Sequence, residues 1–98
     1  MLNAVQDYFF TRRVNTLLQR NGIFLKHYIP GRMRLSFPNW RDNEKNMWLL
    51  IDEMKQDPDI NSIEFTKETG SALILFKPES AAQPLSIKRW LKIIEKYT

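Results

Sequence analysis

The chain has 98 residues, enough for one domain with a modest hydrophobic core. Its net charge of +4 is too mild to indicate nucleic-acid binding, and its lack of cysteine excludes disulfides, thiolate metal sites and a thiol nucleophile. No apolar run approaches the roughly 20 residues of a membrane-spanning helix, and the first residues lack the pattern of a signal peptide, so we expect a cytoplasmic protein.

Residues 1–21 are predicted to form an N-terminal amphipathic helix that ends at Asn21-Gly22, a common helix stop. Its apolar stripe drifts around the helix axis and consists of Leu2, Val5, Phe9, Phe10, Val14 and Leu17. Phe9 and Phe10, with Arg12 and Arg13 just after them, are candidate partner-binding residues. The helix either packs on its own domain, binds a partner chain, or lies on a membrane surface with its arginines at the headgroups. The pattern leaves these three alternatives open.

A half-buried strand is predicted after Pro30-Gly31, which is a turn or bulge signal. Apolar and polar residues alternate from Gly31 to Phe37, and such a period of two places the two sets on opposite faces. The apolar piece before it, residues 22–29, either extends this strand or forms a separate short one. Pro38 ends the strand because proline has no N–H to donate to a neighbouring strand.

Arg32 and Arg34 are the candidate binding residues of this strand. They lie two residues apart and therefore share one face, where two like charges need a carboxylate, an anion or a partner surface. Two interpretations follow. Either a cross-strand salt bridge neutralises them, with Glu64 as the internal counter-charge, or they bind an acidic patch on another molecule.

The rest of the chain predicts a helix, two strands and a last helix. The first of these helices would be capped by Asn39 or Asp42, would bury Met47, Leu50, Ile51 and Met54, and would end by Asp57. A strand at 60–66 leads through a turn at Gly70 into a strand at 72–76, which is apolar on both faces. Such a strand is either buried on both sides or flanked by neighbouring strands on both edges. After a loop at 78–85, Ser86 would cap the helix that buries Trp90 and Ile94.

These elements predict an α+β fold of the ferredoxin-like type. Without the first helix, the order is β-α-β-β-α, a split βαβ unit that lacks its last strand. The strand at 72–76 should then be central, and the strand at 31–37 should have one bare edge, which is a pairing liability. The fourth strand is missing, or is supplied by residues 22–29 or by a partner chain. We therefore expect two parts, the helix at 1–21 and the domain at 22–98.

Three segments carry a resemblance to a known family. They are His27-x-x-Pro30-Gly31-Arg32-x-Arg34-Leu35, Asp57-Pro58-Asp59-Ile60-x-x-Ile63 and Thr69-Gly70-Ser71-Ala72-Leu73-Ile74. Over about residues 25–97 the chain resembles the cysteine-free branch of heavy-metal-associated domains, which often accompany P-type metal-transporting ATPases. The resemblance implies a ferredoxin-like fold, a structural role for Pro30, Gly31 and Gly70, and a part in metal handling. Related domains carry Cys-x-x-Cys in the loop after the first strand, and the corresponding residues 38–42 here contain no thiol.

The resulting functional hypothesis is a non-catalytic adaptor in bacterial metal homeostasis. Its protein partner would be a P-type ATPase or a second copy of the chain, with membrane-surface contact through residues 1–21 as an addition. One alternative is direct binding of a metal ion or haem by His27, the only histidine. Two further alternatives use the same architecture, an acylphosphatase-like enzyme and an RNA-binding module. Both are weak, because no nucleophile–base pair and no aromatic stacking platform is visible. No cofactor is expected.

Overall fold

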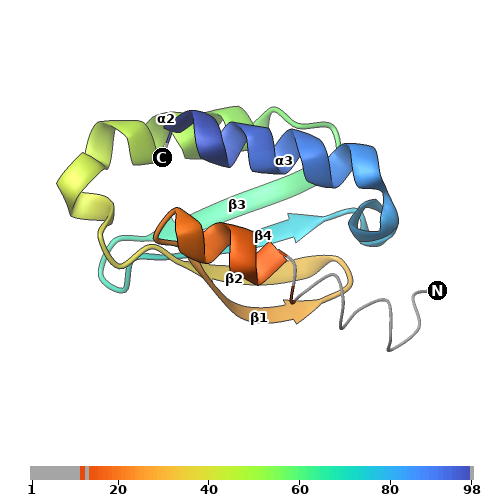
Figure 1. Ribbon diagram of the computed structural model, residues 1–98, viewed down its shortest axis with the longest axis horizontal. Helices are drawn as coiled ribbons and strands as arrows, with labels where there is room; N and C mark the ends of the chain where they lie inside the picture. Colours follow the sequence, from red (N-terminus) through yellow and green to blue (C-terminus); the bar gives the residue numbers. More distant parts are fainter. Residues whose placement is uncertain (1–11, 13, 98) are drawn as a thin grey trace.

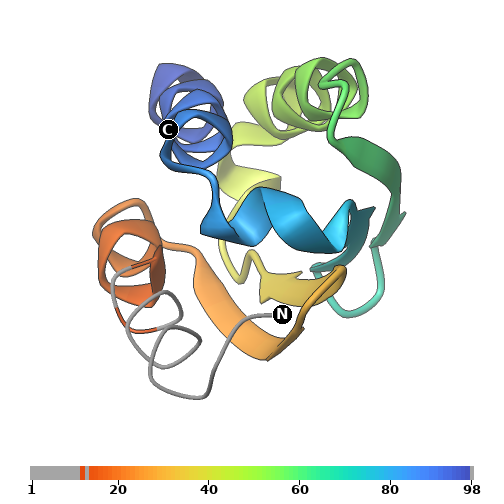
Figure 2. The ribbon, with the colours of Figure 1, turned by 90° about the vertical axis from the view of Figure 1, so that its right-hand side faces the viewer.

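The computed structural model describes residue 12 and residues 14–97. A first helix, at residues 14–20, is followed by two strands, β1 (Phe24–Ile29) and β2 (Arg32–Ser36). Then come the 3-10 helix η1 (Trp40–Asn43), α2 (Glu44–Lys55), β3 (Ile60–Thr66), β4 (Ser71–Phe76), the 3-10 helix η2 (Pro78–Ala82) and α3 (Pro84–Tyr97). The strands form one antiparallel sheet in the order β1-β2-β4-β3, and the first helix, α2 and α3 lie on one side of it (Figure 1, Figure 2). The predicted α+β, ferredoxin-like fold is confirmed.

The fourth strand of the sheet comes from the chain itself. β1 pairs with the edge of β2 that the predicted topology leaves bare, from Phe24 opposite Ser36 to Ile29 opposite Arg32. Pro30 and Gly31 form the tight turn between them, and Gly31 takes a φ of +91°, which a residue with a side chain rarely adopts. Residues 22–29 therefore supply a separate strand. This is one of the two alternatives that the sequence left open, and they do not extend the strand that follows.

β4 is central in the sheet, as predicted, but it is buried on one face only. Ala72, Ile74 and Phe76 point into the core, whereas Leu73 is half-exposed and Leu75 is 38% exposed. Of the two interpretations of its apolar character, the one with neighbouring strands on both edges is confirmed, because β2 and β3 pair with β4. Burial on both faces does not hold, because the described helices cover only one side of the sheet. The apolar residues on the second side therefore face outward, and we call this side the open face.

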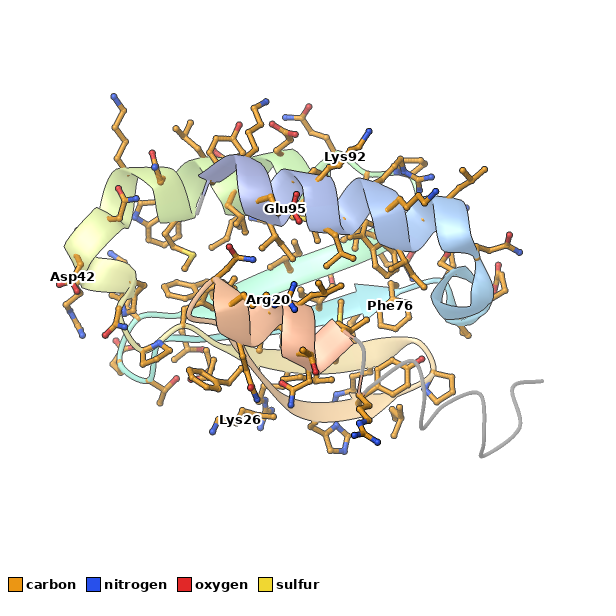
Figure 3. All side chains as sticks on the ribbon, viewed as in Figure 1. Arg20, Lys26, Asp42, Phe76, Lys92 and Glu95 are labelled. Carbon is orange, nitrogen blue, oxygen red and sulfur yellow. The ribbon has the colours of Figure 1, made fainter. Side chains whose placement is uncertain are left out.

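The hydrophobic core fills the layer between the sheet and the helices. The predicted α2 stripe of Met47, Leu50, Ile51 and Met54 is buried there. Figure 3 shows Phe76, which is 1% exposed, between Lys92 on the outer side of α3 and Lys26 on β1. Within the described residues, no helix has the length and apolar character needed to span a membrane.

The described part of the first helix packs on its own domain. Val14 and Leu18 belong to the core, and the side-chain oxygen of Asn15 accepts a hydrogen bond of 3.2 Å from the Leu25 amide. The helix therefore covers the β1 end of the sheet, and of the three alternatives the first holds for residues 14–20. Residues 1–11 and 13, with Phe9, Phe10 and Arg13, lie outside the described residues.

Helix starts differ from the predictions. α2 begins at Glu44, after η1, and neither Asn39 before η1 nor Asn43 before α2 makes a side-chain capping bond. Because η1 provides one tight turn before α2, Asp42 lies inside that turn and cannot cap the helix. α3 begins at Pro84, so Ser86 lies in its first turn and donates instead to Asp59 Oδ2, at 2.6 Å.

Candidate functional site

Strand register places three rows of side chains across the open face. Directly paired residues in a sheet point to the same side, so each row can be read from the pairing. The first row is Ile29, Arg32, Leu75 and Ser62; the second is His27, Arg34, Leu73 and Glu64; the third is Phe24, Ser36, Ser71 and Thr66. None of the described helices covers these rows.

Charge on the open face is unevenly distributed. Arg32 and Arg34 are exposed on β2, and Glu64 lies two strands away on β3, with Leu73 of β4 between it and Arg34. Two strand spacings of about 4.8 Å separate their backbones by roughly 10 Å. No ion pair joins either arginine to an acid within the described residues. The predicted cross-strand salt bridge with Glu64 is therefore wrong, because β4 inserts between the two strands.

Apolar side chains surround the two arginines. Phe24 is 36% exposed, Ile29 46% and Leu75 38%. Lys26 occupies the β1 bulge and places its ammonium nitrogen 5.8 Å from the centre of the Phe24 ring. Guanidinium groups beside exposed aromatic and aliphatic residues are a composition typical of protein interfaces.

His27 also lies on the open face, where it is exposed and paired with Arg34. The positive charge of that arginine disfavours a cation bound at the imidazole. In the part of the chain that the structure describes, no three histidine, aspartate or glutamate residues come together in a way that could hold a metal ion. The acids that a site around His27 would need are therefore not beside it.

The structure separates the predicted partner-binding residues into two groups. Arg32 and Arg34 lie on the open face, whereas Arg12 is exposed on the first helix, which packs on the opposite side of the sheet (Figure 2).

The two glycines for which the family resemblance implies a structural role both lie in turns. Gly31 forms the β1–β2 turn, and Gly70, at φ +65°, ends the β3–β4 turn against Phe37 and Trp40.

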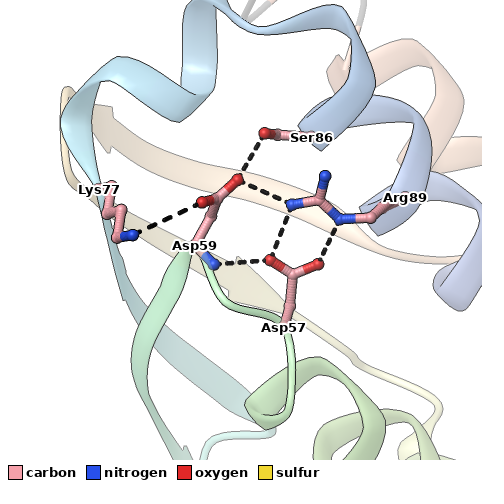
Figure 4. A network of polar contacts seen from close by, with 5 residues as sticks. All are labelled: Asp57, Asp59, Lys77, Ser86 and Arg89. Carbon is pink, nitrogen blue, oxygen red and sulfur yellow. Dashed lines mark hydrogen bonds and ion pairs between the residues drawn. The ribbon is translucent and has the colours of Figure 1, made fainter.

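A polar cluster that sequence reasoning missed ties α3 to the loop before β3 (Figure 4). Arg89 donates to Asp57 from Nε at 2.9 Å and from Nη2 at 3.1 Å, and Nη2 also donates to Asp59 at 2.7 Å. Asp57 accepts a further bond from the Asp59 amide, and Lys77 lies 3.9 Å from Asp59. The signal for this cluster was two aspartates flanking Pro58, but their partner is about 30 residues away along the chain.

Electrostatics identify this cluster as a structural clamp. Burial by itself raises the pKa of Asp57, but the hydrogen bonds from Arg89 and from the Asp59 amide outweigh it and bring that pKa below the usual value. Hydrogen bonds from Ser86 and Arg89 lower the pKa of Asp59 as well. Both carboxylates are thus held in the charged form. A general acid or base needs a pKa near neutrality, so neither aspartate has the properties of one.

Comparison with known proteins gives one family. The model of heavy metal associated domain 2 matches residues 12–96, so it includes the described part of the first helix, which the resemblance drawn from the sequence did not cover. No curated protein and no solved structure shows significant similarity to the chain. The match spans nearly the whole chain, and its fold is the one expected of such a domain. The chain therefore belongs to the heavy metal associated domain 2 family, and its role is metal-associated.

Proposed function

We propose that this protein is a non-catalytic adaptor in metal homeostasis that binds a protein partner through its open face. The observation that carries the proposal is the exposure of Arg32 and Arg34 without an acidic neighbour, among exposed apolar side chains. Family membership supplies the link to metals. With no cysteine in the chain, transfer of a soft metal by thiolate exchange has no ligand set, which favours contact with another macromolecule as the mode of action.

The chemistry of the open face defines the partner. Lys26, Arg32 and Arg34 contribute three positive charges, and Glu64 contributes one negative charge at the far edge. Two copies placed face to face would bring these cations together with too few acids to neutralise them, so a second copy is disfavoured. An acidic surface with an apolar centre matches both the charges and the exposed Phe24, Ile29 and Leu75.

By the resemblance of the sequence, the partner class is a P-type metal-transporting ATPase. Its cytosolic domains, taken from the same source organism, are the probe. Binding is measured by calorimetry at low and at physiological salt. We expect salt-dependent binding, because exposed charge pairs are screened by ions. Replacing Arg32 and Arg34 by glutamate should weaken that binding at least about tenfold, which corresponds to about 1.4 kcal/mol.

A matched control carries the same charge change elsewhere. Lys88→Glu with Lys92→Glu alters two exposed residues of α3, on the opposite side of the sheet, and should leave binding unchanged. Equal loss in both double variants would show only a net-charge effect and would refute the docking site. Absence of binding to any such ATPase domain, or binding to RNA or anionic vesicles instead, would refute the partner class.

The alternative of a metal or haem carrier is tested on the same protein. Titration with Fe²⁺, Zn²⁺ and haem, on the wild type and on His27→Ala, should give no saturable binding that depends on the histidine. Tight binding of a metal ion or haem by the wild type that is lost in His27→Ala would refute the adaptor function and support a carrier function.

A further inference from the structure

A cavity of about 180 Å³ lies at one end of the molecule, away from the open face. The end of the first helix, the η1–α2 junction and the last turn of α3 meet there (Figure 1). Its polar lining is mainly asparagine: Asn21, Asn39, Asn43 and Asn46. Four of the seven asparagines in the chain thus lie around one cavity, although they come from two separate segments.

Two of these asparagines occupy helix-cap positions without capping. Asn39 precedes η1 and Asn43 precedes α2. In neither does the side-chain oxygen accept the hydrogen bond from a first-turn backbone N–H that a capping asparagine usually accepts. Asn46 makes no side-chain hydrogen bond to the described residues either, whereas the Asn21 amide donates to the Leu17 carbonyl oxygen at 3.2 Å. Asn39 and Asn43 are exposed and Asn46 is half-buried, so the amide groups of these side chains are open to water and to a ligand in the cavity.

The remaining lining is apolar or aromatic and carries no charge. Trp40, 6% exposed, and Phe37, 5% exposed, line the cavity together with the half-exposed Tyr97. A cavity of this kind offers hydrogen-bond donors and acceptors beside apolar surface, but no counter-charge for an ion. Its volume suits a single ring and is small for a drug-sized ligand.

We infer that this cavity binds a compact, neutral ring molecule that carries adjacent hydrogen-bond donors and acceptors, with Asn39, Asn43 and Asn46 as its polar contacts. An amide side chain offers one acceptor and two donors, so it can pair with such an edge through two bonds, as asparagine does with adenine. Heterocycles of nucleobase size and monosaccharides share this chemistry. The inference is independent of the open face and of its partner.

The test is a titration followed by amide proton–nitrogen NMR spectra of the full chain. The probes are nicotinamide and uracil for the heterocycle, methyl β-glucoside for the sugar, and nicotinate as an anion of the same shape as nicotinamide. We expect at least one neutral probe to bind with a dissociation constant of about 1 mM, a strength typical of so small a ligand. Shifts should concentrate on the side-chain amides of the three asparagines and on the Trp40 indole. If nicotinamide binds, nicotinate should bind at least fivefold more weakly.

Variants locate the binding. Asn43→Ala with Asn46→Ala should weaken binding at least tenfold, whereas Asn61→Ala, an exposed asparagine of β3, should not change it. If the double variant does not fold, Asn43→Asp keeps the side-chain shape, adds a charge and should weaken binding of the neutral probe. No shift with any neutral probe, shifts elsewhere, or equal binding of nicotinate would overturn the inference.

Discussion

Replacing Arg89 by alanine tests how the clamp between α3 and the β3 loop stabilises the fold. The change removes every bond that Arg89 donates to Asp57 and Asp59. It leaves the Asp57 side chain, only 3% exposed, charged and without its partner. Removing one member of a buried ion pair typically destabilises a protein by about 3–5 kcal/mol. The Arg89 side chain is 42% exposed, so water compensates part of the loss, and we expect the free energy of unfolding to fall by about 2 kcal/mol.

The loss should depend on pH in a direction fixed by the two aspartates. Their pKa values lie below the ordinary value in the folded wild type, so the stabilisation is complete above about pH 4–5 and decreases as the pH falls through the lowered values. Removing Arg89 takes away a hydrogen bond and a positive charge that lower the pKa of Asp57, so this pKa should be higher in the variant than in the wild type. Acidification then protonates Asp57 in the variant and removes its unpaired buried charge. The difference between wild type and variant should therefore be largest at neutral pH and should narrow toward pH 3.

The measurement is thermal and urea denaturation followed by circular dichroism at pH 7 and at pH 3–4. For a domain of this size, 2 kcal/mol corresponds to a fall in Tm of about 8–16 °C. Arg89→Lys, which keeps the charge but cannot form the forked pair, should lose about half as much. Lys88→Ala, the exposed neighbour, should change stability by less than about 0.5 kcal/mol. A loss at pH 7 below about 0.5 kcal/mol for Arg89→Ala, or an equal loss at both pH values, would refute this account of the clamp.

Three further changes test other parts of the fold by the same denaturation assay. Gly70→Ala should cost about 2–3 kcal/mol, because φ is +65° and a Cβ would lie 3.0 Å from the Phe37 carbonyl oxygen. Gly22→Ala, at φ +73° with no atom within 4 Å, should cost only about 1 kcal/mol, and equal costs would contradict the steric argument. Leu18→Ala should cost about 3 kcal/mol because Leu18 is 1% exposed in the core, and a negligible change would show that the first helix is dispensable to the domain. Arg32→Glu with Arg34→Glu should leave stability within about 0.5 kcal/mol, whereas unfolding would make these arginines structural.

The contacts of the Arg89 clamp and the proposed binding residues lie in different parts of the domain. The clamp at Arg89 joins α3 to the loop before β3, and its charged groups are paired within the chain. On the open face, Arg32 and Arg34 have no such partners among the described residues. A change to the open face should therefore affect binding before it affects folding, and a change to the clamp should do the reverse.

Local patterns predicted the elements that depend on neighbours close in the chain. The alternation from Arg32 to Phe37 and the three- and four-residue spacing of the α2 stripe follow from the periods of a strand and a helix, and both are confirmed. Helix starts were predicted less well. Asn39, Asp42 and Ser86 have the residue types of caps, but η1 and the Asp59 carboxylate compete for the same backbone and side-chain bonds.

The sequence by itself determined the strand and helix periods, the topology of the β-α-β-β-α unit, and the absence of a thiol. Only the tertiary structure decided that β1 closes the bare edge, that β4 separates Arg34 from Glu64, and that Arg89 holds Asp57. The physical reason is the separation along the chain of the residues on which each property depends. Backbone periodicity repeats within a few residues, whereas charge pairing and burial depend on which distant segments the sheet and the helices bring together.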